Sequence, residues 1–183
     1  MRILIVAFSR SGGTSLMKWI ASEFNLFWIQ DPMAEWRGED KLNEVWNQNN
    51  IVVKIAPWEY ETEVQKYFDK TIVLIRENIK DVAISLCKAE ERNLWHSQYK
   101  IDDNWLNKNE KRIAELEVSI ESYNNKSLSW KTNDNVLVTY SGVYETGKDI
   151  EVLKEYLGLT DTKYTEMLNP NKRYRTDKIT KII

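Results

Sequence analysis

The sequence contains a single cysteine, a single histidine and no apolar run long enough to cross a bilayer. The lone Cys87 excludes an intrachain disulfide and a cysteine-based zinc site, and it is typical of a reducing compartment. The first predicted strand begins almost at Met1, so we expect neither a signal peptide nor a transmembrane span. Together these features predict a cytoplasmic protein.

A marked excess of charge of either sign is also lacking. Twenty-six basic residues stand against 28 acidic residues, for a formal net charge of −2. No general field would therefore recruit nucleic acid, and any anion-binding surface must be local. The 183 residues suffice to bury a full core and contain no repeat, linker or low-complexity segment. We expect residues 1–183 to form a single domain; the sequence does not indicate its oligomeric state.

Apolar, β-branched runs alternate along the chain with segments of helical periodicity. We predict strands at residues 3–8, 26–29, 51–55, 71–75 and 136–140. We predict helices at residues 14–24, 39–48, 60–68, 79–92, 109–124 and 148–157, with a Trp- and Asn-rich insertion at 94–108. This alternation implies parallel βαβ units. The expected fold class is α/β, a three-layer sandwich around a mostly parallel sheet of about five strands.

Ligands of such sheets bind at the carboxyl ends of the strands. The residues expected at these ends are Ser9, Arg10, Asp31, Lys54, Arg76 and Tyr140. Three of them are cationic, which indicates an anionic ligand. Lys54 either extends to solvent or touches that ligand, and Tyr140 either stacks on a base or packs in the core.

An anion-binding turn is predicted directly after the first strand, in the run Ser9-Arg10-Ser11-Gly12-Gly13-Thr14-Ser15. The two glycines permit a tight turn, and successive N–H groups then converge at a helix N-terminus, where the macrodipole favours negative charge. Thr14 and Ser15 add hydroxyl donors, and Arg10 adds a guanidinium suited to phosphate or sulfate oxygens. The triphosphatase motif G-x-x-x-x-G-K-[ST] is absent, because no Lys follows Gly13.

Two segments resemble motifs of the sulfotransferases. Residues 8–16 resemble the 5′-phosphosulfate loop, most closely its Arg-Ser-Gly-Thr-Thr form in tyrosylprotein and carbohydrate enzymes. Residues 72–86 resemble the 3′-phosphate motif, in which a strand-end Arg and a helix Ser bind one phosphate. Residues 136–159 resemble the family's late strand and helix. The resemblance implies a sulfotransferase that uses 3′-phosphoadenosine 5′-phosphosulfate (PAPS), releases 3′-phosphoadenosine 5′-phosphate (PAP) and needs no metal.

The resemblance also implies roles for individual residues. The loop residues 10–15 would bind the 5′ end of the donor, and Arg76 with Ser85 would bind its 3′-phosphate. Arg173 and Arg175, in the basic tail, resemble the late basic residues that complete the 3′-phosphate site; a solvated charged tail is the alternative.

The base that removes the acceptor's proton departs from the family pattern. Cytosolic members carry a His in a Lys-Thr-His pattern after the third strand, whereas this chain has Lys54-Ile55-Ala56-Pro57. We therefore expect a carboxylate, Asp31 or Glu35, with Glu59 behind them. Lys54 and Arg10 complete the expected catalytic set. The only histidine, His96, lies outside every motif.

Two other functions stay open at this point. One is a small P-loop kinase for a nucleoside or metabolite, although the missing Gly-Lys-Ser/Thr counts against it. The other is a non-catalytic nucleotide-binding module. The acceptor of a sulfotransferase would be a small molecule, a carbohydrate or a phenol, because aromatic-rich insertions suit all of these.

Overall fold

A parallel sheet forms the centre of the computed structural model, which describes residues 1–168 except 33–44, 46, 61, 93–101 and 131–134. Its five strands are all parallel and lie in the order β2-β3-β1-β4-β5. They are β1 (Arg2–Ala7), β2 (Phe27–Gln30), β3 (Ile51–Ile55), β4 (Lys70–Ile75) and β5 (Asn135–Thr139). Each lies close to its predicted position, and the predicted α/β fold class is confirmed.

The strand β1 lies at the centre of the sheet because it is apolar on both faces. Its residues from Ile3 to Ala7 have no exposed surface. Ile3 lies opposite Val52 of β3 on one side and Lys70 of β4 on the other. The chain passes from β1 to the edge strand β2, returns through β3 and then crosses to β4, so the strand order reverses at β1. Such a reversal is where open parallel sheets bind ligands.

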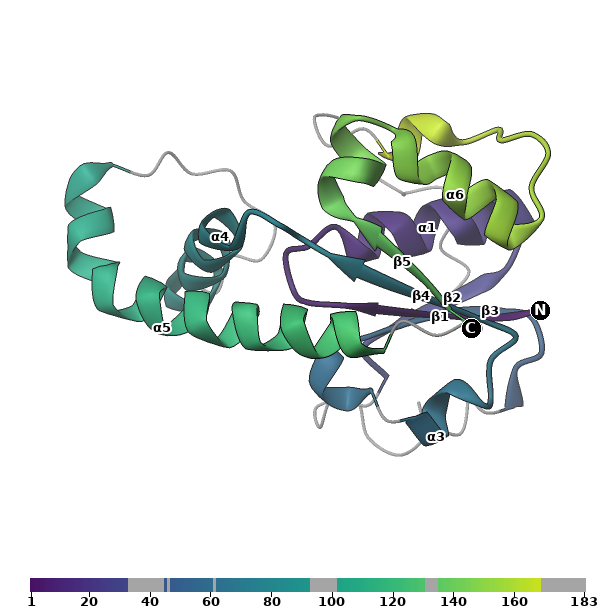
Figure 1. Ribbon diagram of the computed structural model, residues 1–183, viewed down its shortest axis with the longest axis horizontal. Coiled ribbons are helices and arrows are strands. Elements are labelled where there is room, and N and C mark those ends of the chain that lie inside the picture. The colour runs from purple at the N-terminus through teal and green to yellow at the C-terminus, as the bar shows by residue number, and fades with distance from the viewer. Residues whose placement is uncertain (33–44, 46, 61, 93–101, 131–134, 169–183) are drawn as a thin grey trace.

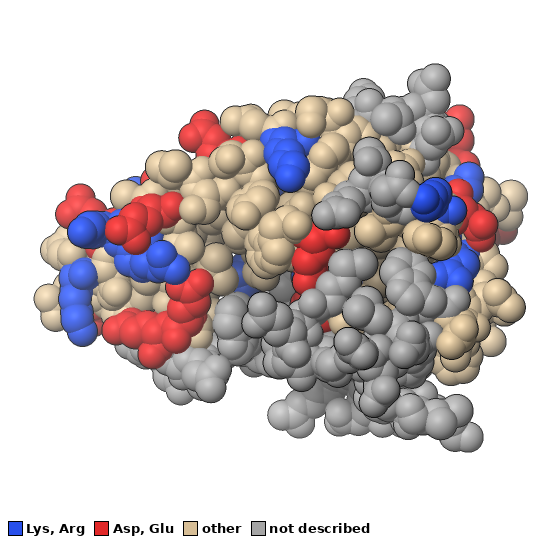
Figure 2. All heavy atoms as spheres, turned by 90° about the horizontal axis from the view of Figure 1, so that it is seen from below, with Lys and Arg blue, Asp and Glu red and all other residues tan. Residues whose placement is uncertain are grey.

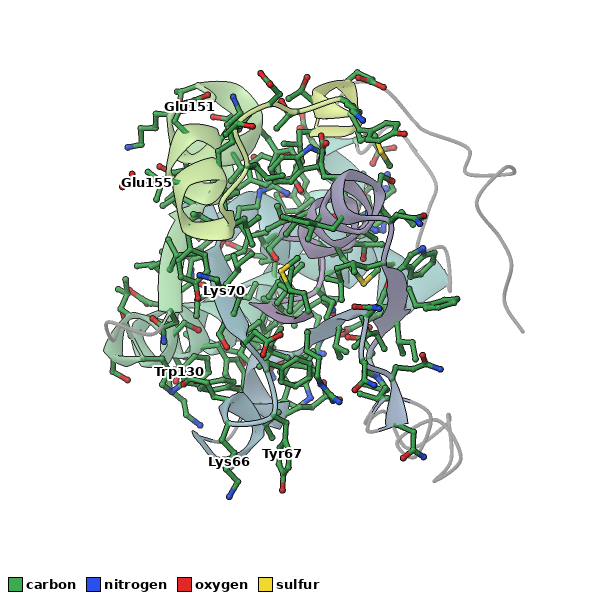
Figure 3. The ribbon with its side chains drawn as sticks, turned by 90° about the vertical axis from the view of Figure 1, so that its right-hand side faces the viewer. Lys66, Tyr67, Lys70, Trp130, Glu151 and Glu155 are labelled. Carbon is green, nitrogen blue, oxygen red and sulfur yellow. The ribbon has the colours of Figure 1, made fainter. Side chains whose placement is uncertain are left out.

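Helices cover both faces of the sheet. They are α1 (Gly13–Phe24), η2 (Pro57–Glu59), α3 (Thr62–Gln65), α4 (Ile79–Arg92), α5 (Asp103–Ser129), η3 (Ser141–Glu145, a π-helix), α6 (Lys148–Leu157) and η4 (Thr165–Leu168). In Figure 1, α1 and α6 lie above the sheet and α3 lies below it. Figure 3 shows the same layers end-on, with Glu151 and Glu155 on one side and Lys66, Tyr67 and Trp130 on the other. This is the predicted three-layer arrangement.

Each face of β1 packs into its own core. Ile3, Ile5 and Ala7 face α1, whose Leu16 and Ile20 are fully buried. On the opposite face, Leu4 and Val6 pack in a second core that includes Tyr60 and Val73. In the part of the chain that the structure describes, no helix is long and apolar enough to cross a membrane.

Capping residues mark the ends of two helices. Asn78 accepts a hydrogen bond from the Asp81 N–H (3.2 Å) before α4, and Gly158 ends α6 in the left-handed conformation (φ 75°). Cys87 is buried in α4. The helix predicted at 60–68 is wrong in length, because only Thr62–Gln65 is α-helical. The helix predicted at 39–48 lies mostly outside the described residues.

The helix α5 is much longer than predicted. Its 27 residues include part of the segment expected to be an insertion. Asp102 caps it, accepting a hydrogen bond from the Trp105 N–H (2.8 Å). Ile113, Leu116 and Ile120 pack against α4, and the two helices extend past the carboxyl ends of the strands (Figure 1).

Charges of both signs are mixed at the far end of the α4–α5 pair, as Figure 2 shows on the face seen from below. Arg112 on α5 pairs with Glu90 of α4 (2.9 Å) and with Glu115 (3.4 Å). Exposed pairs of this kind contribute little to stability, about 0.2–1 kcal/mol each. The extension is therefore held mainly by its apolar interface.

Candidate functional site

The predicted site residues meet at the carboxyl edge of the sheet, around the end of β1. The loop at residues 8–15 leaves β1 and leads into α1, with the ends of β3 and β4 on either side. Lys54 comes from β3, and Arg76 follows β4 directly. The site therefore lies at the reversal of strand order, where sheet topology predicts it.

The loop has the backbone of an anion-binding turn. Arg10 (φ 68°) and Gly12 (φ 89°) both adopt the left-handed conformation. The Ser11 hydroxyl is buried and donates to the Phe8 carbonyl at 2.5 Å, so it closes the turn rather than facing outward. Within the described part of the chain, no hydrogen bond uses the N–H groups of Gly12, Gly13 or Thr14. These donors remain available to a ligand at the positive end of the helix dipole.

Both glycines are required by close neighbours. A Cβ on Gly12 would lie 2.6 Å from the Tyr144 ring, and one on Gly13 would lie 2.6 Å from the Ala7 Cβ. The Tyr144 hydroxyl donates to the Gly12 carbonyl at 2.6 Å. Burial raises the pKa of Tyr144, so this donor stays protonated. The loop is thus fixed from the side of η3, 132 residues away in sequence.

Two guanidinium groups converge beside the loop. Arg10 Nε donates to Ser85 Oγ of α4 (2.9 Å), and Arg76 Nη1 donates to the Arg10 carbonyl (3.0 Å). The Arg76 guanidinium lies 4.2 Å from the Tyr140 ring centroid, in a cation–π contact. Burial and the nearby Arg76 charge lower the pKa of Arg10. The two positively charged side chains therefore lie close together in a partly buried site, where they repel each other. A bound anion would offset this repulsion.

One atom of this pair has no partner. Arg76 Nε is buried and makes no hydrogen bond to any residue that the structure describes. Beside it is a cavity of about 240 Å³, lined by Arg76, Glu77, Asn78, Asp81, Tyr140, Ser141 and Glu145. Asp81 approaches Arg76 Nη2 only to 3.8 Å. Buried donors normally have partners.

A series of hydrogen bonds between side chains connects the loop to the ends of β2 and β3. The Thr14 hydroxyl donates to Gln30 Oε1 (2.9 Å), and Gln30 Nε2 donates to Asp31 Oδ2 (2.9 Å). Lys54 Nζ donates to Asp31 Oδ1 (2.7 Å). The Lys54 side chain is only 3% exposed, so it does not extend to solvent. Its Cε would lie 3.5 Å from a Cβ on Gly13, which places this cation directly against the loop.

A second carboxylate lies on the same side. Glu59 Oε2 accepts a hydrogen bond from the Ala56 N–H at 2.7 Å. Burial raises the pKa of Glu59, and the charge of Asp31 raises it further, against the lowering effects of the Ala56 N–H and Lys54. Among the described residues, no cluster of His, Cys, Asp or Glu side chains could hold a metal ion.

The structure thus brings together the predicted residues that it describes, namely Arg10 to Ser15, Asp31, Lys54, Arg76, Ser85 and Tyr140. Glu35, His96, Arg173 and Arg175 lie outside the described residues. Sequence reasoning missed Gln30 and Tyr144. Gln30 ends a strand next to Asp31, and this position in the sequence is enough to indicate a residue of the site. No sequence pattern indicates that Tyr144 contacts the loop.

The arrangement defines a class of fold. An all-parallel sheet with β1 between β3 and β4, and a glycine loop leading from β1 into a helix, is a P-loop-like α/β fold. No protein-family model matches the sequence, and no curated protein sequence does.

Solved structures with this fold include the following three. The mouse sulfotransferase SULT7A1 complexed with PAP superposes with a TM-score of 0.58 at 16% identity, over 91% of this chain and 61% of that one. The sulfotransferase domain from the curacin biosynthetic pathway gives 0.55 at 14% identity, over 93% and 77%. Shikimate kinase from Bacteroides thetaiotaomicron gives 0.52 at 19% identity, over 87% and 99%.

These likenesses show the fold alone, because the sequence identities are low. The chain also spans only 61% of the mouse sulfotransferase. Both sulfotransferases and a kinase have this fold, so function must be argued from the site.

Proposed function

We propose that this protein is a PAPS-dependent sulfotransferase that transfers a sulfuryl group to a hydroxyl or amine of a small-molecule, carbohydrate or phenolic acceptor. The observation that carries the proposal is the convergence of Arg10, Arg76 and Ser85 beside a glycine loop whose N–H groups are available. A nucleotide with phosphate at both its 5′ and 3′ positions needs two anion sites close together. The loop supplies one, and the guanidinium pair supplies the other.

The residues present fit such a donor. The guanidiniums of Arg10 and Arg76 lie side by side, and Arg76 Nε has no partner in the described part of the chain, so the pair is suited to a phosphate. Arg76 and Ser85 would hold the 3′-phosphate, and the N–H groups of Gly12, Gly13 and Thr14 would hold the 5′ end. Arg173 and Arg175 are proposed to complete the 3′-phosphate site. Mouse SULT7A1, which has the same fold, was solved with PAP.

The chemistry would be divided between the donor and the chain. PAPS, when bound, supplies an activated sulfuryl group on its 5′-phosphate. Charge develops on the oxygens around sulfur during transfer, and fixed cations stabilise it without reorganising. We assign this role to Lys54, and its buried position beside Asp31 and the loop supports the assignment. Arg10 would add a second cation, and the Asp31 or Glu35 carboxylate is proposed as the base.

One observation favours a kinase instead. The chain covers 99% of the shikimate kinase but only 61% of the mouse sulfotransferase. The loop, however, lacks the Lys of the triphosphatase motif, and the nearby Lys54 is paired with Asp31. A kinase is therefore the second candidate.

Nucleotide preference separates the two candidates. We expect PAP to bind about 100-fold more tightly than AMP, which corresponds to about 2.8 kcal/mol of charge-assisted hydrogen bonding to the 3′-phosphate. PAP binding should be unchanged by EDTA. Thermal shift titrations with PAP, AMP and ATP, each with and without magnesium, measure this. Magnesium-dependent binding of ATP that exceeds the binding of PAP would favour the kinase.

A further inference from the structure

Two carboxylates lie beside Lys54, and the structure places them in different roles. Both oxygens of Asp31 are occupied, Oδ1 by Lys54 Nζ at 2.7 Å and Oδ2 by Gln30 Nε2 at 2.9 Å. Its backbone N–H donates to the Lys54 carbonyl at 2.7 Å. Both carboxylate oxygens of Asp31 are thus engaged by side chains of the protein itself, and the residue is suited to hold Lys54.

Glu59 has the opposite arrangement. Its Oε2 accepts the Ala56 N–H, and its Oε1 makes no hydrogen bond to any other described residue. It is half-buried at the end of η2, directly after β3, so its free oxygen stands at the same edge of the sheet as Lys54. The charges of both Asp31 and Lys54 act on this carboxylate.

We infer that Glu59, rather than Asp31, is the group that takes the proton from the acceptor, an inference that rests on the proposed sulfotransferase function. The acceptor O–H or N–H bond breaks, and its proton moves to Glu59. The acceptor's electron pair forms the new bond to sulfur, while the bond from sulfur to the 5′-phosphate oxygen breaks and leaves its electron pair on that oxygen. Lys54, held by Asp31, stabilises the charge that develops.

Electrostatics support this division. Burial raises the pKa of Glu59, and a raised pKa brings a carboxylate closer to the range in which a general base works well at neutral pH. The charged side chains that act on Glu59 are Asp31, which raises its pKa, and Lys54, which lowers it.

The neighbouring residue offers a surface for the acceptor. Trp58 is 49% exposed, although its ring packs edge-on against Phe8 (5.5 Å between centroids) and at a tilt against Tyr123 of α5 (5.4 Å). An exposed aromatic face held in place by two others can contact the apolar part of an acceptor. An acceptor bound against Trp58 would have its reacting hydroxyl or amine near Glu59, the next residue in the chain.

The alternative to a catalytic role is that Glu59 serves only to cap η2. The substitution Glu59→Gln separates the two readings, because a glutamine oxygen still accepts the Ala56 N–H but is not a base. A carboxylate with a raised pKa is disfavoured in its charged form in the folded state, so it weakens the fold above that pKa. Glu59→Gln should therefore keep or raise the melting temperature at neutral pH.

The experiment compares Glu59→Gln, Asp31→Asn and wild type, with Glu155→Gln on the outer surface of α6 as matched control (Figure 3). PAP binding is measured first, then the release of PAP from PAPS with water and with phenol as acceptors, as a function of pH. We expect Glu59→Gln to bind PAP normally, to turn over at least about 100-fold more slowly and to lose the acid limb of the pH–rate profile. Glu155→Gln should behave as wild type.

The outcomes separate the inference from the proposed function. If wild type does not bind PAP, the sulfotransferase proposal fails. If wild type binds PAP, three results would each overturn the assignment of Glu59. The first is turnover of Glu59→Gln within a few-fold of wild type, and the second is an acid limb that persists in Glu59→Gln but disappears in Asp31→Asn. The third is a wild type that never releases PAP from PAPS.

Discussion

Replacing Arg76 with alanine is expected to weaken PAP binding by at least about 100-fold, since each charge-assisted hydrogen bond to a phosphate contributes about 1.5–3 kcal/mol. Arg76 donates to the Arg10 carbonyl at 3.0 Å and lies over Tyr140, and its buried Nε has no hydrogen-bond partner among the residues that the structure describes. Its loss removes a direct phosphate donor and also loosens Arg10. Calorimetric titration of both proteins with PAP measures the effect.

Two further variants make that result specific. Arg76→Lys keeps the charge but not the two-pronged donor, so we expect it to recover only a small part of the affinity. Arg112→Ala removes the same charge from the exposed α5 surface and should leave PAP binding unchanged. Equal weakening by Arg112→Ala and Arg76→Ala would show a general charge effect and contradict the assignment of Arg76 to the phosphate.

Replacing Lys54 with methionine is expected to lower the stability of the fold by about 3 kcal/mol, because breaking a buried ion pair leaves an uncompensated charge. Lys54 is 3% exposed and Asp31 is 22% exposed, so water can only partly solvate the remaining carboxylate. Methionine keeps the length of the side chain, so the loss reports charge rather than packing. For a chain of this size, the melting temperature should fall by roughly 6–12 °C, measured by calorimetry.

A double variant tests the cause of that loss. Adding Asp31→Asn to Lys54→Met removes the unpaired charge, and we expect it to recover at least half of the lost stability. Lys66→Met, on a lysine that points away from the body of the protein in Figure 3, should change stability by less than about 0.5 kcal/mol. A double variant less stable than Lys54→Met would show that the ion pair is not the source of the effect.

The sheet and the position of the site could be predicted because short-range patterns determine them. Buried strands such as β1 are unbroken apolar runs, and parallel topology then brings their carboxyl ends to one edge. This places Arg10 beside Arg76 and Ser85 although they lie far apart in sequence. The predicted ends of two helices also coincide with local caps, Asn78 before α4 and Gly158 after α6.

Features that depend on tertiary packing could not be predicted. Tyr144 contacts Gly12 because η3 packs beside the loop. No local sequence pattern predicts the π-helix η3. The first turns of α5 carry Asn104 and Asn107, which are weak helix formers, yet packing on α4 and the Asp102 cap sustain the helix. The partners of Lys54 likewise depend on the register between β2 and β3, where Gln30 lies opposite Lys54.

A crystal structure of the full chain with PAP, grown in EDTA, tests the central claim most directly. We predict the 5′-phosphate at the N–H groups of Gly12, Gly13 and Thr14, and the 3′-phosphate in contact with Arg76 and Ser85. A nucleotide whose 3′-phosphate lies away from Arg76, or a protein that binds PAP nowhere and instead holds ATP and magnesium at the loop, would contradict the sulfotransferase account.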